Sequence, residues 1–252
     1  MAVDLNADVG EGMDDGALMP YLTSANVACG LHAGDPTVMD MTVAQALARG
    51  VSVGAHPGYP DRENFGRVPM DMPPNSIESL VLYQIGALEV FVRARGARLT
   101  HVKPHGALYH AGAESRQVAR AIAAGIRRAG EGLVVVGQAG SLLLEAALEV
   151  GLPIAREAFA DRRYREDGRL VSRTETDALL TDPDEAAEQA VSLARDGAVF
   201  ARGGARLRME ADTICLHGDT PAAPEIARRI RERFAREGIS VAPLETASRA
   251  RA

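Results

Sequence analysis

Short apolar segments alternate with longer amphipathic ones along the whole chain. Residues 3–9 alternate apolar and polar side chains, which is typical of a strand with one apolar face, whereas residues 133–136 are uniformly apolar. Pro57 and Pro104 close two further segments of this kind. Together these patterns predict seven strands, at residues 3–9, 26–32, 51–56, 99–103, 133–136, 153–159 and 212–217.

The segments between these strands carry apolar residues at helical spacing, and most end at a glycine. Several begin with a capping signal: Asp35 and Asp182 each precede a proline, Ser141 precedes an apolar run, and residues 75–78 resemble a capping box. The predicted helices cover residues 36–49, 75–95, 115–129, 142–150, 183–196 and, opened by Thr220 and Pro221, 222–237. The tail from about residue 247 is expected to be disordered.

Strands and helices alternate throughout and hairpin signals are absent, which indicates a parallel sheet. Seven strand–helix units in 252 residues favour a single domain over residues 1–252. We expect an α/β fold, an irregular seven-stranded parallel (β/α) barrel of TIM-like type. An open, doubly wound sheet is the second possibility.

Composition excludes several functional classes. The net charge of −6 argues against nucleic acid and anionic membranes as partners, and no apolar run is long enough for a membrane span. The chain has only two cysteines, Cys29 and Cys215, which we interpret as small buried residues rather than a disulfide pair. Because the first residues also lack the features of a signal peptide, a reducing, cytoplasmic location is expected.

One position carries the only lysine of the chain, Lys103, although lysine and arginine together number 28. His101 and His105 lie beside it. An ammonium is more compact than a guanidinium and its pKa shifts more readily, so a lysine spared in an arginine-rich chain indicates chemistry rather than general charge. Chance survival of one lysine is the alternative. If its side chain faces a solvated cleft, its replacement should leave the fold nearly intact.

Polar side chains gather where the predicted strands end. In a parallel barrel these ends open on one face, which carries the active site, so residues distant in sequence should meet in one cleft. The set includes Asn6, Asp8, Glu11, His32, His56, Lys103, His105, Glu157, Asp161, His217 and Asp219, whereas His110 is the outlier. Taken singly, each has a structural alternative, such as a helix cap for Asp219.

The common nucleotide and metal motifs are missing. The chain has no phosphate-binding loop of the G-x-x-x-x-G-K-[ST] type and no H-E-x-x-H sequence. A divalent metal remains possible, because a carboxylate and imidazoles are suitable ligands. The candidate ligands are Asp8, His32, His56 and His217, although their spacing does not demand a metal.

Seven segments together resemble the LamB/YcsF family. They are residues 4–11 (DLNADVGE), 24–35 (SANVACGLHAGD), 54–61 (GAHPGYPD), 65–67 (FGR), 102–109 (VKPHGALY), 159–164 (FADRRY) and 215–219 (CLHGD). The resemblance extends from residue 4 to about residue 243. It implies a barrel like those of glycoside hydrolases and deacetylases. It also implies ATP-dependent opening of the lactam 5-oxo-L-proline to L-glutamate, performed with two further subunits that handle ATP.

For that reaction, Lys103 is the expected electrostatic clamp on the carbonyl or phosphorylated oxygen, with Asp8 and His105 as proton-transfer groups. Arg67 or Arg162 would bind the substrate carboxylate. The remaining expected substrate-binding residues are Asn6, Glu11, His32, His56, Glu157, Asp161, His217 and Asp219. Two alternatives stay open: a metal-dependent, deacetylase-like hydrolase acting on a carbohydrate, and a non-catalytic subunit that binds the substrate.

Overall fold

Seven parallel strands form a closed barrel in the computed structural model, which describes residues 2–220 and 222–244. Closure follows from the first strand, which pairs with the second on one edge and with the last barrel strand on the other. In order around the barrel the strands are β1 (Ala2–Val9), β2 (Ser24–Ala28), β3 (Ser52–His56), β4 (His101–Val102), β5 (Val134–Gln138), β6 (Ile154–Phe159) and β9 (Thr213–His217). The predicted seven-stranded barrel is confirmed, and the open sheet is excluded.

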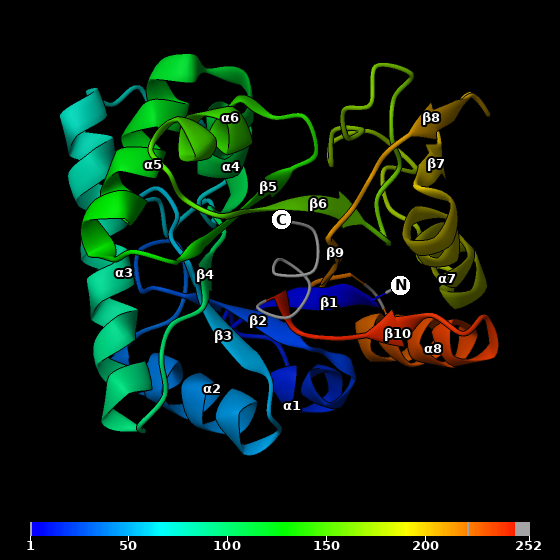
Figure 1. Ribbon diagram of the computed structural model, residues 1–252, viewed down its shortest axis with the longest axis horizontal. Helices are drawn as coiled ribbons and strands as arrows, with labels where there is room; N and C mark the ends of the chain where they lie inside the picture. The colour runs from blue at the N-terminus through cyan, green and yellow to red at the C-terminus, as the bar shows by residue number, and fades with distance from the viewer. Residues whose placement is uncertain (1, 221, 245–252) are drawn as a thin grey trace.

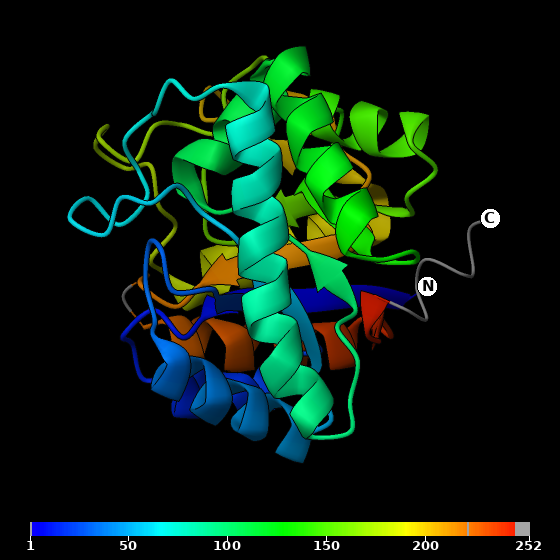
Figure 2. The ribbon, with the colours of Figure 1, turned by 90° about the vertical axis from the view of Figure 1, so that its left-hand side faces the viewer.

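Helices surround the barrel and cover its strands (Figure 1). The longest, α3 (Pro74–Ala94), lies across the outside of the barrel and packs against α5 (Arg116–Ala129), as Figure 2 shows. The others are α1 (Asp15–Leu18), η1 (Met19–Tyr21), α2 (Pro36–Ala48), α4 (Gly106–Glu114), α6 (Leu142–Glu149), α7 (Pro183–Val191), which continues into η2 (Ser192–Asp196), and α8 (Ala223–Arg236). None of the helices in the described ranges is long and apolar enough to cross a bilayer.

Alternate side chains of β1 face two different environments, one apolar and one polar. Val3, Leu5, Ala7 and Val9 belong to the apolar core between the strands and the helices. The intervening Asp4, Asn6 and Asp8 are also buried, and their side chains bond to polar groups of other barrel strands. The barrel interior is therefore a hydrogen-bonded polar network rather than the usual apolar layers.

The predicted helix starts are correct in part. Asp35 and Asp182 cap α2 and α7, since each side chain accepts hydrogen bonds from backbone N–H groups of the first turn. Ser141 occupies the N-cap of α6 without a capping bond. The capping box at residues 75–78 is wrong, because α3 already begins at Pro74. Pro221 and the tail from residue 247 lie outside the described residues.

Four further differences affect the picture of the site. A short antiparallel hairpin, β7 (Ala198–Phe200) and β8 (Arg206–Arg208), contradicts the expected absence of hairpins. A short strand, β10 (Ser240–Val241), pairs with the beginning of β1. Helices α1 and α4 were not predicted. Finally, β2 ends at Ala28, so that His32 lies in the following loop rather than on the strand.

Candidate active site

A cavity of about 300 Å³ opens at the carboxyl ends of the barrel strands. Nine of the predicted site residues line it: Asp8, Glu11, His56, Arg67, Lys103, His105, Arg162, His217 and Asp219. The other four lie behind this wall and are buried, namely Asn6, His32, Glu157 and Asp161. For these four, the geometry indicates support of the wall rather than direct contact with a substrate in the cavity.

Lys103 is buried at the end of β4, with only 2% of its surface exposed. Its Nζ lies 2.9 Å from Asp8 Oδ1, 2.8 Å from Glu157 Oε1 and 3.1 Å from Cys215 Sγ. Burial alone would lower the pKa of Lys103, but Asp8, Cys215 and Glu157 together raise it well above its usual value. The side chain therefore does not face a solvated cleft, and the ammonium is a permanent charge rather than a titrating group.

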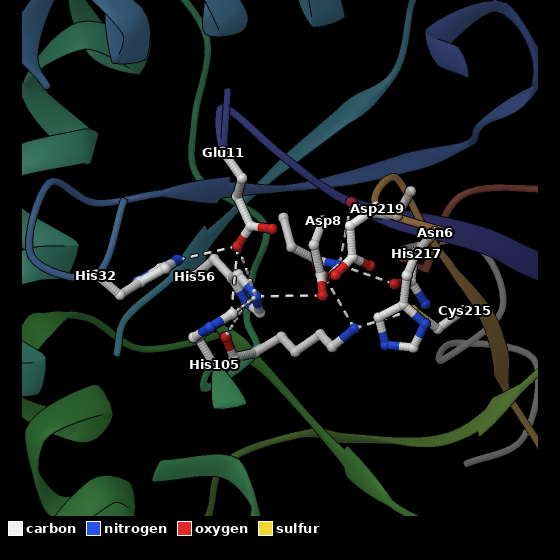
Figure 3. A network of polar contacts seen from close by, with 12 residues as sticks. Asn6, Asp8, Glu11, His32, His56, His105, Cys215, His217 and Asp219 are labelled. Atoms are coloured by element: carbon white, nitrogen blue, oxygen red, sulfur yellow. Dashed lines mark hydrogen bonds and ion pairs between the residues drawn. The ribbon is translucent and has the colours of Figure 1, made fainter. Parts of the chain in front are cut away.

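Three imidazoles and a carboxylate converge on one side of Asp8, whereas Cys215 and His217 lie on its other side (Figure 3). Glu11 Oε1 lies 3.0 Å from His32 Nε2 and 3.3 Å from His105 Nδ1. His56 Nε2 lies 3.0 Å from His105 Nδ1 and 3.3 Å from Asp8 Oδ2. These side chains come from the loops after β1 and β2, from the end of β3 and from the loop after β4.

Burial also controls the protonation of this group. It lowers the pKa of His32 to about 4, so this ring is neutral near pH 7. For His56, burial acts in the same direction, but the charge and hydrogen bond of Asp8 outweigh it and raise the pKa. For Glu11, burial would raise the pKa, yet hydrogen bonds from His105 and His32 bring it well below its usual value. Glu11 is therefore ionised.

On the opposite wall, Asp161 fixes the orientation of His217. Its carboxylate lies 2.9 Å from His217 Nδ1 and accepts bonds from the His217 backbone N–H at 2.9 Å and from Thr220 Oγ1 at 2.6 Å. Burial would raise the pKa of Asp161, but the His217 charge and these bonds lower it to about 2. His217 therefore presents a fixed ring to the cavity.

The arginines at the cavity differ in their partners. Arg67 pairs with Asp219 at 2.5 Å, and Arg173 approaches the same carboxylate at 3.2 Å. Arg162 is 4% exposed and donates to Val171 O at 2.7 Å, whereas its Nε has no hydrogen-bond partner. Burial and the neighbouring Arg173 lower the pKa of Arg162 to about 10. Among the described residues, no carboxylate forms an ion pair with Arg162.

Sequence reasoning missed several cavity residues. His110, taken as the outlier, lines the cavity together with Tyr109, Phe159 and Arg173. Tyr109 and His110 belong to the unpredicted helix α4, so their direction could not be derived. Cys215 is buried behind the cavity wall, where it contacts Lys103. It could have been found, because in β9 it lies between Thr213 and His217 at the two-residue spacing of one strand face.

The four predicted metal candidates do not form one group. Within residues 2–220 and 222–244, two groups of side chains have the spacing of metal ligands. One comprises Glu11, His32, His56 and His105, and the other comprises Asp8, Cys215 and His217. His32 and His56 are therefore separated from His217, and Glu11 and His105 complete their group.

Comparisons with known proteins agree over nearly the whole chain. The LamB/YcsF family matches residues 3–249. The 5-oxoprolinase A-subunit of Methylococcus capsulatus is 52% identical over 248 residues, 96% of this chain and 95% of its own. The protein of the same name from Pyrococcus furiosus is 49% identical, with 97% and 98% covered.

Solved structures extend the comparison. The "Lactam Utilization Protein" of Thermus thermophilus is 43% identical and superposes with a TM-score of 0.91, covering 96% of this chain and 99% of its own. A "T48 deacetylase with substrate" superposes at 0.54 with 13% identity over 99% and 91% of the two chains, a likeness that shows the fold alone. Family match, identity and barrel together lead to one conclusion: the chain belongs to the LamB/YcsF family.

Proposed function

We propose that this chain is a subunit of an ATP-dependent 5-oxoprolinase, a hydrolase that opens the lactam of 5-oxo-L-proline to give L-glutamate. The names of its relatives support the reaction class. The observation that carries the proposal is the buried Arg162 at the cavity wall, which has no carboxylate partner among the described residues. The substrate is a small cyclic amide with one carboxylate, and it would supply that partner.

The substrate carboxylate pairs with Arg162 in this proposal. A buried guanidinium is costly without an opposite charge, and its planar fork matches a carboxylate. Arg67, the other expected candidate, already holds Asp219 at the cavity mouth. The lactam ring would then extend from Arg162 toward Lys103 and Asp8, which also line the cavity.

Ring opening adds water to the lactam carbonyl, breaks the carbon–nitrogen bond and delivers a proton to the nitrogen. Asp8 and His105 are the proposed proton-transfer groups, since both face the cavity. Lys103 stabilises negative charge on the carbonyl oxygen. Because its ammonium contacts two carboxylates and a sulfur, the substrate oxygen would replace Cys215 Sγ, the weakest of the three acceptors.

ATP is bound by partner subunits in this proposal, of which the family resemblance implies two. The chain has no phosphate-binding loop, and its one lysine is buried in the barrel. Cys29 and Cys215 are free thiols, which suits the reducing cytoplasm. Among the comparisons, the alternative of a carbohydrate deacetylase is supported only by a shared fold.

Reconstitution tests the proposal. Release of L-glutamate from 5-oxo-L-proline is measured with this chain alone, with the partner subunits alone, and with all subunits plus ATP. We expect turnover only in the complete mixture, and no tight ATP binding by the isolated chain in calorimetry. Full turnover by the partner subunits alone would contradict the proposal.

The carboxylate contact has its own test, the substitution Arg162→Gln in the reconstituted system. We expect KM for 5-oxo-L-proline to rise on the order of a hundredfold, because a buried charge pair is lost. The free energy of unfolding should not fall, since an unneutralised buried cation is removed. Arg163→Gln is the matched control, because the neighbouring Arg163 forms an ion pair with Glu185, a partially exposed contact. Equal KM values for both variants would refute the role of Arg162.

A further inference from the structure

Two imidazole rings in the cavity wall point ring nitrogens at each other. His56 Nδ1 lies 2.7 Å from the carbonyl oxygen of Lys103, and His105 Nε2 lies 2.8 Å from that of Phe65. A carbonyl can only accept, so these two nitrogens carry hydrogen, and in neutral rings His56 Nε2 and His105 Nδ1 are left as lone pairs. Those two atoms are 3.0 Å apart. Facing lone pairs repel unless a cation lies between them.

Carboxylate oxygens face the same point. Glu11 Oε1 lies 3.3 Å from His105 Nδ1 and 3.7 Å from His56 Nε2, and Asp8 Oδ2 lies 3.3 Å from His56 Nε2. His32 Nε2 completes the ring of donor atoms, at 3.0 Å from Glu11 Oε1. Ligands placed about 2.1 Å from a tetrahedral ion lie about 3.4 Å from one another, which is the range seen here.

The buried charges around this cluster have a negative excess that a cation would neutralise. Asp8, Glu11 and Glu157 have buried carboxylate side chains, and Lys103 contacts only Asp8 and Glu157 among them. Within the described ranges, the ion pairs of Glu11 involve histidines alone. With the imidazoles neutral, as metal ligands must be, three carboxylates against one ammonium amount to two unbalanced negative charges, the charge that a divalent ion would neutralise.

The surrounding backbone holds these rings in place. Phe65, whose carbonyl accepts from His105, has a positive φ of 56°, which a non-glycine residue rarely adopts. The next residue, Gly66, packs so closely that a Cβ there would lie 2.8 Å from His32 Cβ and 3.0 Å from His105 Cδ2. Carbonyl acceptors that fix the far nitrogen of a histidine are the usual outer support of metal-binding imidazoles.

We infer that Glu11, His32, His56 and His105 form a binding site for a divalent transition metal. Three imidazoles with one carboxylate favour ions such as Zn²⁺ or Co²⁺ over Mg²⁺, which prefers oxygen ligands. Glu11, His56 and His105 also line the substrate cavity. An ion held there would be a Lewis acid at the wall of that cavity. In the metal-bound chain, His105 Nδ1 would hold the ion while Nε2 stays bonded to Phe65 O, so Asp8 would be the remaining proposed proton-transfer group. Metal binding itself is tested without lactam hydrolysis.

The test uses the purified full chain, stripped with a chelator and then titrated with Co²⁺ alone. We expect the visible d–d absorption of a nitrogen-ligated Co²⁺ ion, saturating near one ion per chain. In calorimetry, Zn²⁺ should bind at least roughly a hundredfold more tightly than Mg²⁺. Absence of the Co²⁺ spectrum in the unmodified chain would overturn the inference and leave a proton shared between His56 and His105.

Variants locate the ion. Glu11→Gln and His105→Gln should each weaken Zn²⁺ binding by about a hundredfold or more. His110→Gln is the matched control, because this exposed histidine lines the same cavity outside the cluster. It should bind Zn²⁺ as the unmodified chain does. If His110→Gln loses binding and His105→Gln retains it, the assigned ligands are wrong. Should a variant fail to fold, the Co²⁺ spectrum of the unmodified chain still decides.

Discussion

The ammonium of Lys103 holds together side chains from three other strands. It contacts Asp8 of β1, Glu157 of β6 and Cys215 of β9, all within the barrel. Both carboxylates are buried, and this ammonium compensates their charge, with His56 as a second partner of Asp8. Lys103 is consequently as much a structural residue as a catalytic candidate.

The substitution Lys103→Met separates these two roles. We expect the free energy of unfolding to fall by about 3–5 kcal/mol, since two buried carboxylates lose their partner, and turnover to be lost. Lys103→Arg should also fail, because a wider guanidinium has no space in this buried position. Urea unfolding measures the first effect. Arg128→Met, which breaks the exposed pair with Glu78, is the control and should cost less than about 1 kcal/mol.

A Lys103→Met chain as stable as the unmodified one would show that the carboxylates find another partner or take up protons. A stable variant that also keeps full turnover in the reconstituted system would favour the alternative of a non-catalytic, substrate-binding subunit. The two measurements therefore distinguish the structural role of Lys103 from the catalytic one.

For this single residue, the sequence indicated the importance of Lys103 but not that its side chain is buried. Its uniqueness in the chain is visible in the sequence, and its position after a strand indicated the cavity. Its partners are separated from it by up to 112 residues, and they meet only through the register of barrel closure. Local patterns contain no information on that register, so the burial of Lys103 could not be predicted from them.

At the level of elements, the turn at Phe65 and Gly66 packs against the start of α4 and against the loop that carries His32. Ala107 N donates to Gly66 O at 2.9 Å, and a Cβ on Gly106 would lie 2.7 Å from that oxygen. This contact explains why α4 was not predicted. His105 caps α4 without a side-chain bond, so a tertiary contact at Gly66 replaces the capping signal that revealed α2 and α7.

Gly66→Ala tests the importance of this turn. An alanine there would push against His32 and His105, so we expect turnover to fall by about a hundredfold and Zn²⁺ binding to weaken. Gly50→Ala is a matched control, because Gly50 has a similar φ of +69° but no atom within 4 Å of its Cβ position. It should cost about 1 kcal/mol of stability and leave turnover intact. Equal turnover in the two variants would contradict a steric role for Gly66.

Strands and capped helices were largely predictable, because period and capping are local properties. The β7–β8 hairpin was missed because its strands have three residues each, too few for alternation to be detected. β4 has only two residues, so the predicted segment 99–103 was too long at both ends. Such short strands are defined by their neighbours rather than by their own pattern.

In the whole molecule, barrel closure depends on polar contacts inside the barrel. Asp4 of β1 accepts hydrogen bonds from Ser24 of β2 at 2.7 Å and from Thr213 of β9 at 2.5 Å, on both sides of the closure. Thr23 adds a third bond at 2.7 Å. Burial nevertheless raises the pKa of Asp4 to about 6, since these hydroxyl bonds offset only part of the lost hydration.

This pKa makes the stability of the barrel depend on pH. The pKa of Asp4 is about 6 in the folded chain against 3.8 for the free group, so the folded state binds the proton more tightly. The contribution of Asp4 to stability is fully present below pH 3.8 and is lost as pH rises through about 6. We expect this loss to reach roughly 3 kcal/mol, with no further change at higher pH.

Asp4→Asn isolates this contribution, because asparagine cannot titrate. Other groups affect the unfolding free energy of both chains alike, so the difference between variant and unmodified chain reports Asp4. Urea unfolding at several pH values should give a difference that shifts in favour of the variant between about pH 4 and 6 and is constant above. Asparagine also offers fewer hydrogen-bond acceptors than aspartate. That loss changes the difference in unfolding free energy by the same amount at every pH, so the pH dependence of the difference still reports the titration of Asp4. A flat difference across the whole range would mean that Asp4 stays ionised in the barrel, and that its three hydroxyl donors fully replace water.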